Sequence, residues 1–208
     1  VSGSTASNKI YDGTTTATLG GTPAFQATEA AGTGTTSDGK PYSVDSVSAG
    51  GTAAGTFADR NVGTTKAITV TGVTVTGTGN GNYTVTQQTD LTADITAKAL
   101  TVSGSTASNK IYDGTTTATL GGTPAFQATE AAGTGTTSDG KPYSVDSVSA
   151  GGTAAGTFAD RNVGTTKAIT VTGVTVTGTG NGNYTVTQQT DLTADITAKA
   201  LTVDRKST

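Results

Sequence analysis

Leu91–Ala97 reads LTADITA, and this stretch decides the fold class of the chain. Leu91, Ala93, Ile95 and Ala97 share one face, and the polar residues share the other. Alternation with a period of two is the pattern of a half-buried β-strand. Since no segment of similar length has a clear helical period, the stretch indicates antiparallel strands with one face on a core.

Three further segments alternate in the same way: Ala67–Thr71, Val73–Thr76 and Tyr83–Thr86. Threonine is abundant in all three, and its branched Cβ suits the pleated surface of a sheet. Gly72 divides the first two segments and predicts a bulge or a turn. These segments extend the strand prediction over much of the repeat.

Turns and irregular segments separate the strands. Asp12-Gly13, Asp38-Gly39 and Asn80-Gly81 are dipeptides typical of hairpin turns. The middle of the repeat is less periodic, and we expect only short strands there, at Pro41–Val44 and around Val47.

The predicted fold is mainly β, with tandem antiparallel β-sandwich-like domains of about seven strands each. The alternative is a β-grasp-like sheet with one short helix. That helix would span Phe25–Ala31 and end at Gly32.

The whole pattern repeats without a single difference: residue n recurs at n+101, so Val1 returns as Val102 and Val203. A period of this length is that of a complete small domain rather than of a solenoid coil. We expect a first repeat at 1–99, an identical second repeat at 100–200, and the start of a truncated third repeat plus a tail at 201–208. Since Val1 is not an initiator methionine, we expect the chain to be part of a longer protein.

The junction between the repeats, Ile95–Val102, contains no Gly, Pro or Ser and continues the alternation. A flexible linker would be rich in Gly and Ser. The junction therefore predicts that the last strand of one repeat continues almost directly into the first strand of the next, giving a stiff pair with a small interface.

Composition excludes several classes of function. The chain has no Cys, Met, Trp or His, so disulfides, thiolate zinc sites and histidine bases are absent. The chain contains twelve basic and fifteen acidic residues and no basic cluster, which argues against nucleic acid as a partner. No apolar run is long enough for a transmembrane helix, so we expect no direct membrane insertion. Each repeat has 25 Thr and 15 Gly but only 16 Leu, Ile, Val and Phe, which predicts a thin core.

The most distinctive string is KIYDGTT at Lys9–Thr15, in which Asp12 can bond the following backbone and Gly13 can take the turn. It resembles the signature of the YDG repeat of large bacterial surface adhesins, including filamentous-haemagglutinin-like proteins. FADRNVGT at Phe57–Thr64, GNYT at Gly81–Thr84 and ADITAKALTV at Ala93–Val102 resemble further parts of the same repeat in the same order.

The least family-like stretch is Ala24–Ala49. The resemblance implies a secreted, bacterial cell-surface protein and carries no catalytic residue.

The candidate motif residues are expected to be structural. In the two repeats they are Tyr11, Asp12, Gly13, Asn82, Tyr83, Tyr112, Asp113, Gly114, Asn183 and Tyr184. The alternative is a ligand-binding role for Tyr11 and Asp12. We expect an architectural turn with a half-buried tyrosine, no catalytic residue, no metal site and no cofactor. Asp90 and Asp94 would share the outer face of their strand, without a pocket that could make them a catalytic pair.

The sequence favours neither a calcium site nor an internal amide crosslink, two features that stabilise some surface domains. Calcium requires clustered oxygen ligands, and no loop contains several carboxylates close together. An amide crosslink requires a buried lysine beside a carboxyl group. Lys9, Lys40, Lys66 and Lys98 are the candidate amines, with Glu29 as the proton shuttle, but the sequence indicates no enclosure for any of them.

The sequence therefore predicts a structural role rather than an enzyme. We expect a stalk or spacer repeat of a bacterial adhesin, relevant to cell adhesion and biofilm, whose partners are neighbouring identical repeats. A host or matrix ligand would bind other parts of the parent protein. The alternative is a repeated weak-affinity module for glycan or host protein that acts by avidity, with Tyr11, Tyr42 and Tyr83 as contacts.

Overall fold

The computed structural model describes residues Val1–Asp204, and the chain divides into two compact units, Val1–Ala97 and Lys98–Thr208. Unit 1 contains seven strands and one short 3-10 turn, η1 (Asn80–Asn82). The strands are β1 (Ser2–Ala6), β2 (Lys9–Ile10), β3 (Thr16–Ala17), β4 (Leu19–Ala24), β5 (Ser46–Phe57), β6 (Gly63–Thr78) and β7 (Thr92–Thr96).

Unit 2 repeats this order with one additional strand. Its elements are β8 (Lys98–Ala107), β9 (Lys110–Ile111), β10 (Thr117–Ala118), β11 (Leu120–Phe126), β12 (Ser147–Phe158), β13 (Gly164–Thr179), η2 (Asn181–Asn183), β14 (Tyr184–Thr187) and β15 (Thr193–Thr197). The equivalents of the β14 residues in unit 1, Tyr83–Thr86, are not in a strand.

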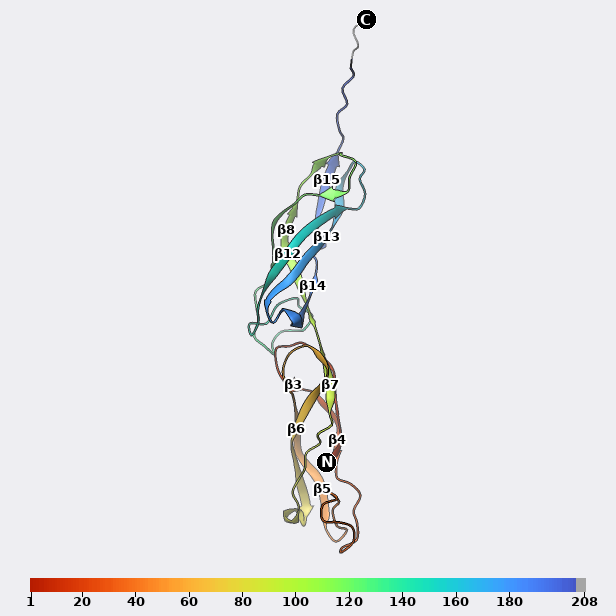
Figure 1. Cartoon of the computed structure of the whole chain (residues 1–208), viewed down its shortest axis with the longest axis vertical. Helices are drawn as coiled ribbons and strands as arrows, with labels where there is room; N and C mark the ends of the chain where they lie inside the picture. The colour runs from red at the N-terminus through yellow and green to blue at the C-terminus, as the bar shows by residue number, and fades with distance from the viewer. Residues whose placement is uncertain (205–208) are drawn as a thin grey trace. The chain divides into compact units, whose positions relative to one another are not determined.

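Each unit has two sheets, and Figure 1 shows the long hairpin that dominates the larger one, β5–β6 in unit 1 and β12–β13 in unit 2. The larger sheet has the order β2-β7-β6-β5-β3 in unit 1 and β9-β15-β13-β12-β10 in unit 2. The smaller sheet is β1-β4 in unit 1 and β11-β8-β14 in unit 2. The mainly β, sandwich-like prediction is therefore confirmed.

Two details of that prediction are wrong. The sheets are mixed rather than purely antiparallel, since β2 pairs with β7, β9 with β15 and β14 with β8 in parallel. Phe25–Ala31 is not helical, so the β-grasp-like alternative is wrong as well. Glu29 in this segment instead forms a parallel bridge with Tyr42, which joins the two ends of the loop between β4 and β5.

The short strand predicted around Val47 is in fact the start of a twelve-residue strand, β5, and the short strand predicted at Pro41–Val44 does not form. The Gly and Ala residues of β5 are poor strand formers by themselves. Their small size is required here, because a Cβ at Gly55 would lie 2.8 Å from the side chain of Leu19. Pairing with β6, rather than local propensity, makes this segment a strand.

The core is thin and lies under the larger sheet of each unit. In unit 2 it consists of Ala118, Phe158, Ile169, Val171, Ala194 and Ile196. Ala93 and Ile95 in β7 are buried as their alternation predicted. Among the described residues, no helix is both long and apolar enough to cross a membrane.

Gly72 shows why a glycine is required within a long strand. It lies inside β6 at φ 85°, where the pairing of β5 with β6 shifts register between Gly51 and Ala54. The bulge prediction is thus confirmed. A Cβ at Gly72 would clash with the carbonyl oxygen of Thr52.

Gly72→Ala is therefore expected to destabilise the chain by about 1–3 kcal/mol, because it combines positive φ with a backbone clash. Gly81→Ala is the matched control, since a Cβ there meets nothing within 4 Å, and it should change the stability by less than about 0.5 kcal/mol. Urea denaturation measures both. Equal effects of the two substitutions would contradict the assignment of a strained bulge.

Candidate functional site

The YDG string forms a turn that the side chain of Asp12 holds together. Asp12 Oδ1 accepts hydrogen bonds from Lys9 Nζ and from the backbone N–H of Thr14, both at 2.8 Å. Gly13 follows at φ 77°, and Lys9 Nζ lies 5.4 Å from the centroid of the Phe57 ring. The carboxylate of Asp12 is thus engaged within the turn, and the N–H of Tyr11 joins the turn to the end of β7 by donating to the Thr96 carbonyl at 2.8 Å.

The second copy repeats this geometry. Lys110 Nζ donates to Asp113 Oδ1 at 2.9 Å, and the hydrogen bonds from Lys110 and Thr115 lower the pKa of Asp113 to about 2. Gly114 has φ 81°. Tyr112 is half-buried as predicted, whereas Tyr11 is fully buried. The two copies of this tyrosine thus differ in exposure, and a ligand-binding role for Tyr11 stays an alternative.

The GNYT string anchors a long loop. In unit 1, Tyr83 Oη donates to Asp45 Oδ2 at 2.7 Å and accepts the backbone N–H of Tyr42 at 3.0 Å. The hydrogen bond to Asp45 raises the pKa of Tyr83. Asn82 precedes it at the end of η1 and is exposed. The motif therefore fixes the end of the loop that connects β4 to β5.

Unit 2 makes the same contacts in a buried setting. Tyr184 Oη donates to Asp146 Oδ2 at 2.8 Å and accepts the backbone N–H of Tyr143 at 3.0 Å. Tyr184 and Asn183 are 6% and 3% exposed. These two side chains are more buried than their equivalents in unit 1 because β8 pairs with β14 beside them.

Lys98, the first residue of β8, is completely buried. Its Nζ lies 2.6 Å from Glu130 Oε1 and 2.9 Å from Asp139 Oδ1. It also lies 4.0 Å from the centroid of the Tyr143 ring. We call Glu130, Asp139 and Tyr143 the lysine seat. All three come from the loop between β11 and β12.

Electrostatics keep this lysine charged. Burial alone would lower the pKa of Lys98, but hydrogen bonds to Glu130 and Asp139 outweigh burial and raise it. Burial likewise opposes ionisation of Asp139, and the hydrogen bonds from the Lys141 N–H and from Lys98 nevertheless lower its pKa. The seat thus forms an ion-pair network of two half-buried carboxylates around a buried lysine.

The expectation that no lysine is enclosed is wrong for Lys98. The sequence offers Lys98 as a candidate amine and Glu29, the unit 1 equivalent of Glu130, as the proton shuttle. It does not indicate Asp139 as a partner of Lys98. One signal could have identified the site: Lys98, Leu100 and Val102 share the inward face of an alternating segment. A lysine at a core position needs buried partners of opposite charge.

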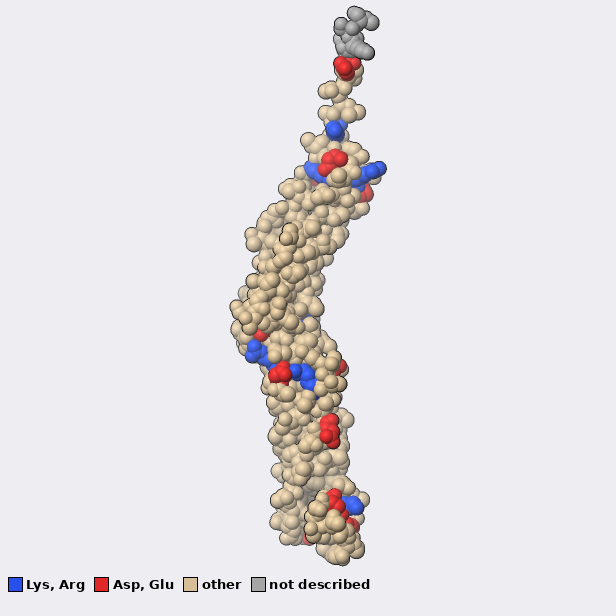
Figure 2. Space-filling view, viewed as in Figure 1, with Lys and Arg blue, Asp and Glu red and all other residues tan. Residues whose placement is uncertain are grey.

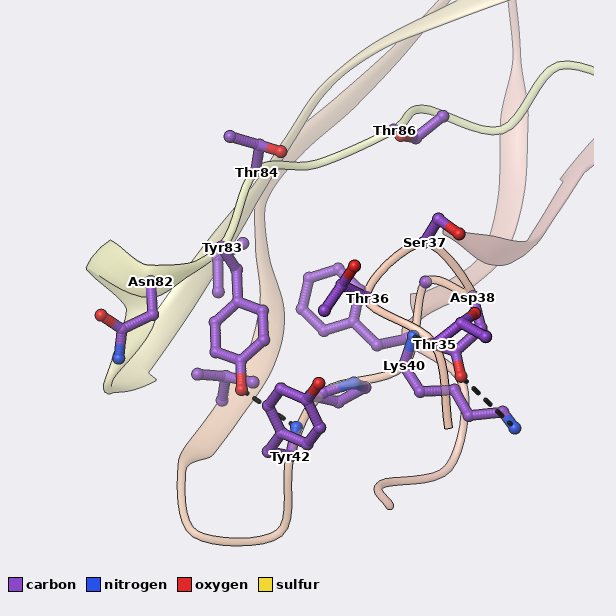
Figure 3. A pocket seen from close by; sticks show the side chains of 15 residues that line it. Thr35, Thr36, Ser37, Asp38, Lys40, Tyr42, Asn82, Tyr83, Thr84 and Thr86 are labelled. Carbon is purple, nitrogen blue, oxygen red and sulfur yellow. Dashed lines mark hydrogen bonds and ion pairs between the residues drawn. The ribbon is translucent and has the colours of Figure 1, made fainter. Parts of the chain in front are cut away.

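In unit 1 two of the residues equivalent to the seat, Asp38 and Tyr42, line an open cleft of about 440 Å³. One wall is the loop Thr35–Tyr42, and Asn82–Thr84 and Thr86 lie opposite (Figure 3). Lys40 Nζ lies 4.0 Å from Asp38 Oδ2. Glu29 Oε1 is buried without a hydrogen-bond partner, and burial together with the nearby charge of Asp38 raises the pKa of Glu29.

Of the remaining acidic candidates, Asp90 is exposed and Asp94 binds a backbone N–H. Asp94 Oδ1 accepts the backbone N–H of Thr65 at 2.8 Å, which holds Thr65 at a positive φ of 48°. Within Val1–Asp204, no three His, Cys, Asp or Glu residues are grouped so that they could hold a metal ion.

The two copies provide a matched pair of substitutions for the lysine seat. Lys98→Met is expected to destabilise unit 2 by about 1–3 kcal/mol, because it leaves two half-buried carboxylates without their cation. Lys199→Met has identical sequence neighbours but alters an exposed side chain, so it should have little effect. Thermal and urea unfolding measure both. Similar stabilities for the two variants would show that the buried ion pair contributes nothing.

An amide between Lys98 Nζ and the Asp139 or Glu130 carboxyl carbon would release one water. The raised pKa of Lys98 favours the ammonium form, which has no lone pair for attack. The intact mass of the purified chain should therefore equal the mass calculated from its sequence. A mass lower by one water would instead establish the crosslink.

Comparison with protein families finds one match, to the YDG domain, at residues 1–90 and 96–191. Comparisons with curated proteins and with solved structures find no significant match. The second match begins at Thr96 and so includes the segment that carries Lys98, in agreement with the place of β8 in unit 2. Because the two matches cover most of the chain, this protein belongs to the YDG-domain family and contains two tandem copies of the domain.

Proposed function

We propose that the chain is a stalk or spacer segment of a bacterial cell-surface adhesin, which holds a distal binding region away from the cell. The observation that carries the proposal is the strand-to-strand junction between identical units. β7 ends at Thr96 and β8 begins at Lys98, so only Ala97 separates them. A connection of one residue lacks the length and the Gly/Ser content of a flexible linker.

Engagement of the motif side chains within each unit supports the same role. The YDG turn uses its aspartate and lysine internally, and the GNYT tyrosine is bonded to an aspartate of the same unit. A spacer needs stable copies and no exposed reactive constellation. We therefore propose that the protein is not an enzyme and that its function depends on the number of copies.

The binding-module alternative has weaker support. Tyr11, one of its three expected contacts, is buried. Tyr42 and Tyr83 line the cleft of unit 1, but their equivalents in unit 2, Tyr143 and Tyr184, are buried. Avidity requires the same surface on every copy, and these tyrosines do not provide it. Clear hits of the two-unit chain on a glycan array would favour this alternative.

Nucleic acid is a poor partner for this surface. Six lysines lie within 4.0 Å of a carboxylate: Lys9, Lys40, Lys66, Lys98, Lys110 and Lys167. The face of the chain in Figure 2 is mostly uncharged, and its basic groups lie close to acidic ones. Phosphate binding requires unpaired positive charge, which supports exclusion of nucleic acid from the proposed partners.

Small-angle X-ray scattering of the two-unit chain tests the spacer proposal. A rod should give a maximum dimension on the order of 60–80 Å, from two units with strands of about ten residues at ~3.3 Å each. A variant with a Gly/Ser linker inserted after Ala97 is the matched control and should scatter as a broader ensemble. If the unmodified chain is as flexible as this control, the spacer proposal fails.

Secretion to the cell surface is part of the same proposal. Antibodies against the repeat should label intact cells of the source bacterium, and external protease should remove the label without lysis. Labelling only after permeabilisation would contradict a surface location.

A further inference from the structure

We propose that each YDG unit bears tension along the chain, and that its resistance to unfolding under tension resides in parallel contacts between its first and last segments. The proposal deepens the stalk role and rests on it, since a stalk between a cell and a bound target is pulled from both ends. In unit 2 these contacts join Lys98–Ile111 to Tyr184–Thr197, and we call them the terminal seam.

Backbone pairing forms both ends of the terminal seam. Lys98–Thr101 of β8 pairs in parallel with Tyr184–Thr187 of β14. Further along the chain, Lys110–Ile111 of β9 pairs in parallel with Ile196–Thr197 of β15. The first and last segments of the unit therefore run in the same direction at both pairings.

Side chains continue the terminal seam between these two pairings. Gln189 Oε1 accepts the Ser105 N–H at 2.9 Å, and Gln189 Nε2 donates to the Ser105 carbonyl at 3.2 Å. Asn109 Oδ1 accepts the Asp195 N–H at 2.7 Å. The side-chain amide of Gln189 thus takes the place of a backbone peptide group, opposite a residue of β8 that is 4% exposed.

Unit 1 has the same contacts at the equivalent positions. Gln88 forms two hydrogen bonds with the backbone of Ser4, at 3.0 and 3.1 Å. Asn8 Oδ1 accepts the Asp94 N–H at 2.8 Å, and β2 pairs in parallel with β7. The glutamine and asparagine contacts therefore belong to the repeat and occur in both units.

The direction of the terminal seam decides how tension acts on it. In two parallel strands, the start of one and the end of the other lie at opposite ends of the pair. Tension on the start of the first segment and on the end of the last segment therefore slides the two segments along each other. Sliding loads all the hydrogen bonds between them together, whereas pulling on the open end of an antiparallel hairpin breaks its bonds one after another.

Gln188 provides a matched control for Gln189. It forms the same two hydrogen bonds with the backbone of Val174, at 3.3 and 2.7 Å, and Val174 is likewise 4% exposed. These bonds join the last segment to β13 and lie outside the terminal seam. Loss of either glutamine should therefore lower the equilibrium stability similarly, whereas only loss of Gln189 should weaken the seam.

Single-molecule force spectroscopy of the two-unit chain, held by its two ends, tests the proposal. The unmodified chain should show two unfolding events, each of which releases on the order of 300 Å of extended chain. Combined Gln88→Ala and Gln189→Ala should raise the unfolding rate at constant force about tenfold or more, because each seam loses two hydrogen bonds to buried backbone groups.

Combined Gln87→Ala and Gln188→Ala is the control and should change this rate by less than about threefold, because its lost bonds do not join the two sliding segments. Urea denaturation verifies that both double variants are folded and similarly destabilised. Equal acceleration of forced unfolding by the two double variants would show that the load passes through the larger sheet, and would overturn the proposal.

A second pulling direction tests the geometry with the terminal seam unaltered. The chain has no cysteine, so Ser144→Cys and Asn181→Cys provide unique attachment points just beyond the open end of the β12–β13 hairpin. Tension between these two points separates the hairpin bond by bond and should unfold unit 2 at a lower force than tension between the chain ends.

Equal unfolding forces in the two pulling directions would overturn the proposal, also in the case that the seam variant fails to fold. The stalk role fails separately, since a chain that is flexible in solution scattering can still unfold at high force. A rigid chain with a weak terminal seam would leave the stalk role standing and refute the load-bearing role alone.

Discussion

The buried ammonium of Lys98 is the interaction on which unit 2 depends. It joins the first strand of the unit to the loop between β11 and β12, through Glu130 and Asp139. That loop in turn holds Asp146, the acceptor of the Tyr184 hydroxyl, and β14 begins at Tyr184. A charge at this depth is tolerated only with close partners of opposite sign. One lysine thus organises a strand, a loop and the edge of a sheet.

The two units form an internal comparison at constant sequence. Where Lys98–Thr101 is present, the smaller sheet has three strands, and Tyr143 and Asp146 are buried. In unit 1 the smaller sheet has two strands, and Tyr42 and Asp45 are only half-buried. The second unit therefore begins at Lys98, two residues before the start at residue 100 that the sequence predicted. The family match from Thr96 agrees with this limit.

The composition of the repeat reflects its small number of large apolar residues. Threonine covers the outer faces of the long strands. Glycine occurs where neighbouring strands of the same unit approach too closely for a Cβ. Gly72 faces the Thr52 carbonyl across a bulge, and Gly55 packs against Leu19. Ordered polar contacts, such as Lys9 with Asp12 and Lys98 with Glu130, join segments that the small core does not hold together.

The sequence by itself determined the mainly β class, the tandem repeat, the inward face of β7 and the turn at Asp12-Gly13, because each depends on neighbours within a few residues. The tertiary structure alone decided the strand state of Ser46–Phe57, the parallel pairings and the lysine seat. Lys98 meets Glu130 across 32 residues, and Tyr143 meets Tyr184 across 41. Contacts at such separations leave no local periodicity. For the same reason Tyr83–Thr86 and Tyr184–Thr187, identical in sequence, differ in structure: only the latter has a strand beside it.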